Sequence, residues 1–249
     1  MFRKTLLTQI SCVGLLITLS GAVWADDAPL TGFLTEKQAP DSLMLLPPPP
    51  VMNSAAFLRD KAAYEEGLTL RDTPRGKQAI LDADLSDGNL GKPFSEAVGV
   101  AISREHTPQT FILLKRLLAD SGDSATKSAK SYYMRTRPFA LFNAHSCTPD
   151  DEVWLRKNGS YPSGHTAFGW SAALVLSEMV PERQNEILKR GYEFGQSRVI
   201  CGAHWQSDVD AGRVMGAAAA SRLQIDSAFD SQFQKAKREL RHLLTQKKV

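Results

Sequence analysis

The chain has 249 residues, of which 43% are hydrophobic and 23% are charged, and its formal net charge is +3. These values are ordinary for a folded globular protein, and the length is enough for one sizeable hydrophobic core. No long basic block suggests a nucleic-acid partner, and no segment after the N-terminus is long and apolar enough to span a bilayer.

Residues 1–25 have the pattern of a secretory signal peptide. Arg3 and Lys4 precede an apolar stretch, and small residues near Ala25 fit a cleavage site. The alternative is an uncleaved membrane anchor. Cleavage removes both basic residues, so we expect a mature chain that is close to neutral.

Residues 26–50 end in "LLPPPP", which predicts an extended, polyproline-like arm. Such an arm either lies over the surface of the protein or is a solvated leader. Residues 51–249 are expected to form the folded domain that follows it.

Apolar residues recur at helical spacing along most of this domain, and strand-like alternation is scarce. Capping residues support several boundaries; one segment begins at Thr107 and Pro108 and is expected to end at Gly122. The sequence therefore predicts a single all-α domain. Its predicted helical segments are 54–70, 73–85, 107–122, 124–138, 163–179, 181–195, 207–223 and 231–248.

Cleavage of the signal removes Cys12 and leaves Cys147 and Cys201 as a pair. An even pair of cysteines in an exported, oxidising setting predicts a disulfide bond. Two buried free thiols are the alternative.

The segment "KSYYMRTRP" places Lys130 and Arg137 seven residues apart. Seven residues are nearly two helical turns, so both cations are expected on one face of a helix that ends before Pro138. Taken alone, the pattern also fits a solvated basic face.

The segment "GSYPSGHTAFGW" opens an apolar helix with Ser163, Gly164 and His165. A helix N-terminus with such small residues offers unpaired backbone N–H groups and a favourable dipole to an anion. The sequence therefore predicts an anion site at this point.

In "SRVICGAHWQSD", Arg198 and His204 flank a turn at Gly202, and Asp208 follows His204 by four residues. A carboxylate one turn from an imidazole can accept its Nδ1 proton and leave Nε2 free as a nucleophile or base. Alternatively, Asp208 serves only the N-terminus of the next helix. Together, the three segments supply cations, histidines and a carboxylate suited to phosphoryl transfer without a metal.

These segments contain the patterns K-x6-RP, PSGH and SR-x5-H-x3-D, the three-part signature of the type 2 phosphatidic acid phosphatase superfamily. Over nearly the whole mature chain, the sequence resembles the class A bacterial non-specific acid phosphatases of that superfamily. The resemblance implies an all-α bundle of the kind shared with vanadium haloperoxidases. It also implies a periplasmic acid phosphatase that hydrolyses phosphate monoesters through a phosphohistidine and can transfer phosphate to other alcohols.

By position, the resemblance implies that His204 is the nucleophile, that Asp208 orients it, and that His165 protonates the leaving oxygen and then activates water. It implies no cofactor and no metal, small phosphate esters as partners, inhibition by vanadate, and a homo-oligomer in many members. Neither nucleic acid nor a membrane is expected as a partner after signal cleavage. The phosphoryl oxygens are expected to be bound by the side chains of Lys130, Arg137 and Arg198 and by the backbone amides of Ser163 and Gly164.

Other functions fit parts of the pattern. A periplasmic apyrase would use the same chemistry on nucleoside tri- and diphosphates, and a vanadium-dependent haloperoxidase would hold vanadate in the same pocket. A non-catalytic phosphate-binding protein would not need a free imidazole beside a carboxylate. The membrane lipid phosphatases share the signature but need spanning helices. The sequence leaves the physiological ester open.

Overall fold

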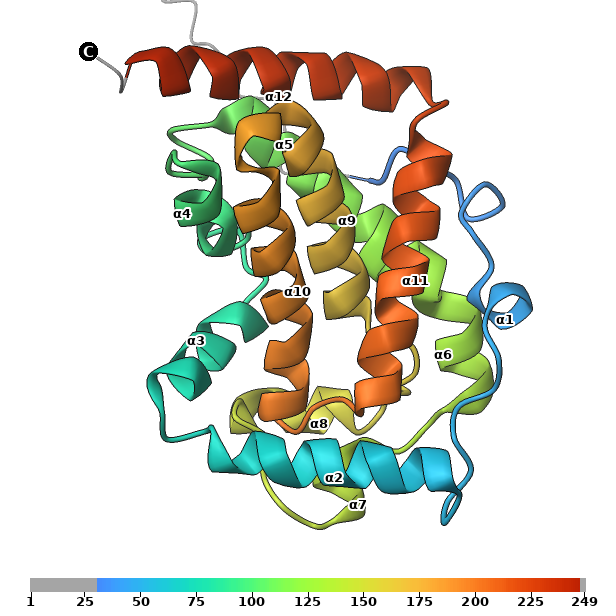
Figure 1. Ribbon diagram of the computed structural model, residues 1–249. Helices are drawn as coiled ribbons and strands as arrows, with labels where there is room; N and C mark the ends of the chain where they lie inside the picture. The colour runs from blue at the N-terminus through green and yellow to red at the C-terminus, as the bar shows by residue number, and fades with distance from the viewer. Residues whose placement is uncertain (1–30, 247–249) are drawn as a thin grey trace, which may run out of the picture.

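The computed structural model describes residues 31–246, and within this range the chain contains helices and no β-strand. The predicted all-α fold is confirmed. Three long helices stand side by side at the centre of the molecule (Figure 1). They are α9 (Gly164–Met179), α10 (Gln184–Ile200) and α11 (Gln206–Leu223).

The middle helix, α9, is apolar on most of its faces, as a helix covered by neighbours must be. Two glycines of α11, Gly212 and Gly216, let this helix approach α9 closely. A Cβ at Gly212 would lie 2.6 Å from the backbone oxygen of Ser163, and a Cβ at Gly216 would lie 2.4 Å from that of Ala167. The sequence of α11 thus fixes how near its N-terminal end lies to that of α9.

Other helices enclose this central trio (Figure 1). Helix α12 crosses one end and packs on α5, whereas α2 crosses the opposite end, and α3 and α4 flank α10. The longer surrounding helices are α2 (Ala55–Thr69), α3 (Pro74–Ala83), α5 (Pro108–Leu117) and α12 (Ser227–Gln246); the shorter ones are α1 (Ser42–Leu45), α4 (Ser95–Val98), α6 (Lys127–Tyr133), α7 (Pro138–Leu141) and α8 (Glu152–Leu155).

The largest apolar cluster fills the α12 end of the trio. It joins residues of α9, α10, α5 and α12. The opposite end of the trio is where the N-termini of α9 and α11 meet the C-terminus of α10 (Figure 1). Members of the cluster include Phe94, Phe111, Leu114, Phe168, Leu176, Phe194, Phe229 and Leu240.

Two predicted helix boundaries are wrong in an informative way. Gly122 does not end the helical run, because residues 118–123 continue α5 as a π-helical turn that leads into α6. The predicted helix over 124–138 ends early, at Tyr133, where Met134 takes the left-handed conformation with φ of 41°. Arg137 is therefore not on a helix face with Lys130; it lies in extended backbone just before α7.

Residues 31–50 of the Pro-rich arm pack on the helices. The Asp120 carboxylate accepts hydrogen bonds from the backbone N–H groups of Phe33 at 2.8 Å and Leu34 at 3.0 Å. The Tyr161 hydroxyl donates to the Pro47 carbonyl at 2.7 Å. Within the described residues, the arm therefore lies against the helices. It is not extended throughout, because Ser42–Leu45 form the short helix α1.

The predicted signal peptide, residues 1–25, lies outside the described residues. Within residues 31–246, no helix combines the length and apolar character that crossing a membrane requires.

Candidate active site

The three predicted segments meet at the end of the trio opposite α12. The N-terminus of α9 carries His165, the C-terminal turn of α10 carries Arg198, and His204 precedes α11. A cavity of about 670 Å³ opens here, and its wall includes Lys130, Arg137, His165 and His204. The fold thus brings residues from distant parts of the chain to one pocket.

Arg137 reaches this pocket from the loop before α7, and its side chain is buried. Its Nη1 donates to the Ala203 carbonyl at 3.0 Å and contacts Nε2 of His204 at 2.9 Å, while Nε donates to the Leu155 carbonyl at 2.9 Å. Lys130 and Arg137 therefore line the same cavity because the loop after α6 folds back toward it. They do not share the helix face that the sequence had predicted.

Lys130 is half-buried on α6. Its Nζ donates to the backbone carbonyls of Pro162 at 2.7 Å and Gly159 at 3.3 Å. Burial, assisted by the nearby charge of Arg137, lowers the pKa of Lys130 to about 7. The ammonium of Lys130 therefore titrates near neutrality.

Arg198 is a buried cation near both histidines; it is only 1% exposed, and its Nε and Nη1 have no hydrogen-bond partner among the described residues. Burial lowers its pKa to about 10, so the guanidinium is still charged at neutral pH. Buried charged donors are normally paired, and an anion would supply the missing acceptors.

His204 is held between Arg137 and Asp208. The guanidinium of Arg137 can only donate, so Nε2 of His204 accepts from it and the ring proton resides on Nδ1. That Nδ1 lies 3.4 Å from Oδ2 of Asp208 and forms no hydrogen bond among the described residues. Burial, followed by the charges of Arg137, Lys130 and Arg198, lowers the pKa of His204 well below its ordinary value. The buried imidazole is therefore neutral, with its Nε2 lone pair in the cavity wall.

Asp208 caps α11, which is one of the two roles that the sequence left open, and it also lies beside His204. Its Oδ2 accepts from the Trp205 backbone N–H at 2.8 Å, which caps α11, and the same oxygen faces His204. Its other oxygen, Oδ1, accepts from Arg135 at 2.5 Å. Arg135 was missed by the sequence analysis, since a basic residue two positions before Arg137 carries no signal of a buried partner.

His165 is tethered to α3. Its Nε2 lies 3.0 Å from the carbonyl of Ala83, the last residue of that helix. A carbonyl only accepts, so Nε2 carries the proton in the neutral ring and Nδ1 is left as the basic nitrogen. Burial, followed by the charge of Arg198, lowers the pKa of His165 well below its ordinary value.

The helix N-terminus of α9 is only partly available to an anion. The backbone N–H of Ser163, a predicted phosphate ligand, donates here to the Asp208 carbonyl at 2.9 Å. The Ser163 hydroxyl oxygen caps α9 by accepting from the N–H of Thr166 at 3.3 Å. By contrast, the amides of Gly164 and His165 have no acceptor among the described residues, as first-turn amides of a helix usually do not.

Helix packing also requires a glycine at position 164, independently of the predicted anion site. A Cβ at this position would lie 2.5 Å from the backbone oxygen of Gly122, in the π-helical turn after α5. Packing of α9 on that turn therefore requires glycine here, whether or not an anion is bound.

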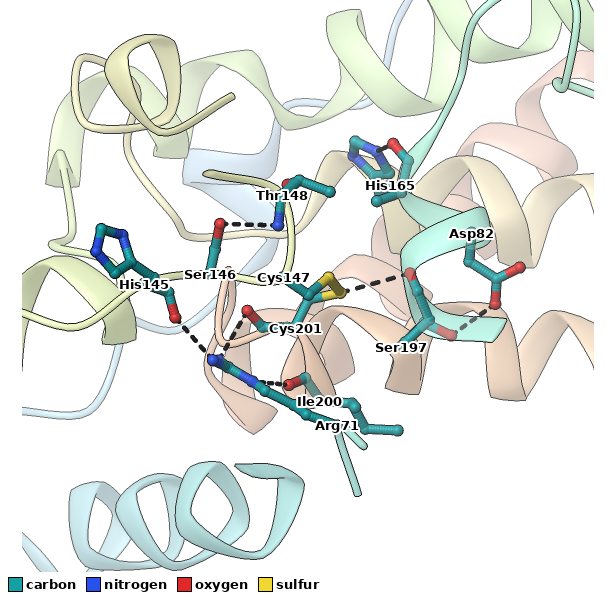
Figure 2. Close-up of a disulfide and its surroundings, with 12 residues drawn as sticks. Arg71, Asp82, His145, Ser146, Cys147, Thr148, His165, Ser197, Ile200 and Cys201 are labelled. Atoms are coloured by element: carbon teal, nitrogen blue, oxygen red, sulfur yellow. Dashed lines mark hydrogen bonds between the residues drawn. A yellow bond between two sulfur atoms is a disulfide. The ribbon is translucent and has the colours of Figure 1, made fainter. Parts of the chain in front are cut away.

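The predicted disulfide is present between Cys147 and Cys201. The backbone N–H of Cys147 also donates to the Cys201 carbonyl at 3.0 Å. Figure 2 shows Arg71 below the disulfide, where it donates to the carbonyls of Ile200 at 2.9 Å, Cys201 at 3.0 Å and His145 at 2.7 Å. These bonds fix the loop after α7 to the end of α10, just before the turn that leads to His204.

Ser197 is the first residue of the SR-x5-H-x3-D pattern, but it does not line the cavity. Its hydroxyl donates to the Asp82 carboxylate at 2.6 Å (Figure 2), and Asp82 also pairs with Arg190. This buried network joins α10 to the end of α3, and it thereby positions the Ala83 carbonyl that holds His165.

The comparisons with known proteins agree with this geometry. Residues 112–225 match the PAP2 superfamily, and this range contains every predicted site residue from Lys130 to Asp208. A non-specific acid phosphatase of Providencia stuartii is 54% identical over 211 residues, which are 85% of this chain and 85% of that protein. One from Salmonella typhimurium strain LT2 is 54% identical over 84% of this chain and 83% of its own. An acid phosphatase of Zymomonas mobilis is 37% identical, with 83% and 81% covered.

The chain therefore belongs to the PAP2 superfamily, and within it to the class A bacterial non-specific acid phosphatases. It is an acid phosphatase, and the names of its relatives support this function over an apyrase or a haloperoxidase.

Proposed function

We propose that the enzyme hydrolyses phosphate monoesters through a phosphohistidine at Nε2 of His204. The observation that supports this most directly is the arrangement around His204. The ring is neutral, its proton is on Nδ1 toward Asp208, and its Nε2 lone pair lies at the cavity beside Arg137. A phosphoryl group that enters between Arg137 and His204 takes over the hydrogen bond of the guanidinium and meets the free lone pair.

We expect the phosphoryl charge to be met by Lys130, Arg137 and Arg198 together with the Gly164 amide. Such fixed donors stabilise the charge that develops in phosphoryl transfer, which needs positioning more than covalent chemistry. The N–H groups at Nε and Nη1 of Arg198 have no acceptor among the described residues, and phosphoryl oxygens could accept hydrogen bonds from them.

In the first step, the N–P bond to His204 forms while the bond from phosphorus to the ester oxygen breaks. Protonated His165 donates a proton to that leaving oxygen. Because its Nε2–H is held by the Ala83 carbonyl, the proton that moves is the one on Nδ1. Neutral His165 then accepts a proton from water, whose oxygen attacks phosphorus and releases inorganic phosphate and free His204. An alcohol in place of water gives phosphate transfer.

The outer part of the cavity fits varied leaving groups. Its wall combines Leu118, Met134 and the exposed Trp154 with Lys127 and Glu36. At about 670 Å³, the cavity is within the range that accommodates whole small molecules. Recognition thus rests on the phosphate, and the leaving group is loosely constrained.

The test is rapid-quench kinetics on p-nitrophenyl phosphate and glycerol phosphate. His204→Ala should abolish turnover of both, because no covalent intermediate can form. His165→Ala should lose about 10²–10⁴-fold on glycerol phosphate, whose alkoxide needs a proton. On p-nitrophenyl phosphate, it should keep a burst of nitrophenol and accumulate phosphohistidine. His242→Ala, at an exposed histidine on α12, is the matched control. A burst retained by His204→Ala and lost by His165→Ala would reverse the roles.

We further propose that no metal takes part. Residues 31–246 hold no group of three or more His, Cys, Asp or Glu side chains arranged for a metal ion, and Lys130 and Arg137 of the cavity wall can meet the phosphoryl charge themselves. Activity should survive excess EDTA, and orthovanadate should inhibit as a transition-state mimic. Loss of activity in EDTA that magnesium or zinc restores would contradict this mechanism.

The signal-like residues 1–25 and the disulfide support export to the periplasm. Fractionation of cells and N-terminal sequencing of the mature protein test this location. Sedimentation velocity tests whether the protein forms a homo-oligomer.

A further inference from the structure

A row of buried charges runs from α2 to the proposed nucleophile. Asp60 on α2 is 2% exposed, and Arg135, in the loop after α6, lies between it and Asp208. Nη2 of Arg135 donates to Oδ2 of Asp60 at 2.7 Å, and Nη1 donates to Oδ1 of Asp208 at 2.5 Å. Asp208 in turn faces His204. The row thus alternates in sign, and its last member is the imidazole.

Every oxygen of both carboxylates is engaged. Ser207 donates its backbone N–H to Oδ1 of Asp60 at 2.8 Å and its hydroxyl to Oδ2 at 2.6 Å. Trp205 donates its backbone N–H to Oδ2 of Asp208. Arg135 therefore occupies Oδ1 of Asp208 and leaves Oδ2 as the oxygen that faces His204. Without that bond, the carboxylate could rotate toward other donors.

The guanidinium is suited to this task because its planar fork reaches two carboxylates at once in a fixed geometry. A lysine ammonium would keep the charge but lose the fork. The side chain of Arg135 also lies over the Trp205 ring, with 5.4 Å from its Cζ to the ring centroid, which further fixes its position.

We propose that Arg135, held by Asp60, is a positioning residue for phosphoryl transfer: it sets the rotation of Asp208, and through Asp208 the orientation of His204. This inference rests on the proposed phosphohistidine at His204. Arg135 touches neither the nucleophile nor the wall of the cavity, so its removal should slow the chemical step and leave phosphate binding largely intact.

The first measurement is the rate of phosphohistidine formation in Arg135→Met. Misplacement of a reacting group by about 1 Å can cost about 10²-fold, so we expect kcat to fall by about that factor with little change in KM. Arg213→Met is the matched control. Arg213 is also a largely buried arginine that pairs with a carboxylate of α11, Asp210 at 2.8 Å, but it bonds to Gln196 and not to the pocket. It should keep kcat within about threefold of the wild type.

The second measurement is a double-mutant cycle with Asp208→Asn. If Arg135 acts through Asp208, its loss should matter little once the carboxylate is gone, and the double variant should lie within about threefold of Asp208→Asn. A merely structural role would instead give losses that multiply.

Removal of one partner of a buried ion pair can prevent folding, so milder variants accompany Arg135→Met. Asp60→Asn keeps the shape of the anchor, and Arg135→Lys keeps the charge. Both variants should lower kcat, but less strongly than Arg135→Met does. A melting temperature raised by inorganic phosphate, as in the wild type, shows that each variant is folded with an intact phosphate site.

Wild-type kcat in folded Arg135→Lys and Asp60→Asn, or multiplying losses in the cycle, would overturn the inference alone, provided that the wild type forms phosphohistidine. A wild type that never forms phosphohistidine would overturn the proposed function and this inference together.

Discussion

Burial of two imidazoles among cations determines how single residues respond to pH. The pKa of His204 is lowered first by burial and then by Arg137, and that of His165 first by burial and then by Arg198. The proposed attack by His204 needs a neutral imidazole, and the lowered pKa of His204 keeps that form present in acid. The proposed role of His165 as general acid needs a protonated imidazole, so its lowered pKa should make the free enzyme lose activity as the pH rises.

We therefore expect bell-shaped pH profiles on the acid side. The acid limb of kcat/KM should lie below about 6.5, the ordinary histidine value, because the free His204 loses its proton at lower pH. Bound phosphate offsets the surrounding cations and raises the pKa of His165, so the alkaline limb of kcat should lie at higher pH than that of kcat/KM. Profiles of both constants on p-nitrophenyl phosphate check this. An acid limb above the ordinary histidine value would contradict the arrangement.

Lys130 gives a separate pH-dependent prediction. Because the pKa of Lys130 is about 7, its charge is present in acid and is lost as the pH rises through neutrality. Lys130→Met should therefore weaken inhibition by inorganic phosphate strongly in acid and much less in mild alkali. The ratio of the two inhibition constants cancels the titration of phosphate itself. A ratio that stays constant from acid to alkali would show that Lys130 remains charged throughout.

At the scale of elements, the position of α11 against α9 connects packing with catalysis. Gly212 lies one turn after Asp208, and its Cα faces the residue that caps α9. In Gly212→Ala, the new Cβ would lie 2.6 Å from the Ser163 backbone oxygen, so one helix has to move. Overpacking of this kind costs about 1–3 kcal/mol.

We expect Gly212→Ala to lower the melting temperature by about 2–4 °C per kcal/mol and to lower kcat as well, since α11 carries Asp208 away from its place. Gly88→Ala is the control, because its nearest neighbour would be the Ser86 hydroxyl at 3.9 Å. Thermal unfolding and steady-state kinetics measure both effects. An unchanged melting temperature in Gly212→Ala would mean that the two helices tolerate separation.

The sequence predicted the elements better than the connections between them. Helical periodicity located the central trio, and an anion-binding N-terminus was expected at Ser163 from the small residues there. The end of α6 at Tyr133 was not predicted, because Met134 adopts a left-handed conformation that no glycine announces. The residues that pair with Arg135 were also out of reach, since Asp60 is 75 positions away and nothing local specifies that contact.

On the scale of the whole molecule, segments far from the pocket keep its parts in register. The arm is bound by Asp120, in the π-helical turn that lies against Gly164, and by Tyr161, which precedes α9. Glu36 of the arm also lines the cavity. The arm therefore covers the elements on one side of the site, whereas the disulfide and Arg71 fasten the other.

The last prediction concerns that disulfide. It closes a loop with a sequence separation of 54, and the chain-entropy relation gives about 4 kcal/mol for a loop of this length. Cys147→Ser/Cys201→Ser should therefore unfold at a markedly lower temperature. Neither cysteine lines the cavity, and the Arg71 bonds and the backbone bond between these positions do not depend on the sulfur atoms. We accordingly expect kcat at a temperature below unfolding to stay within about tenfold of the wild type, an allowance of about 1.4 kcal/mol in the activation barrier.

Thiol labelling of the denatured, unreduced wild type verifies the bond, and Arg71→Met shows what the arginine contributes without loss of the disulfide. A folded double variant with no activity would show that the covalent bond itself, and not the contacts around it, holds the turn before His204.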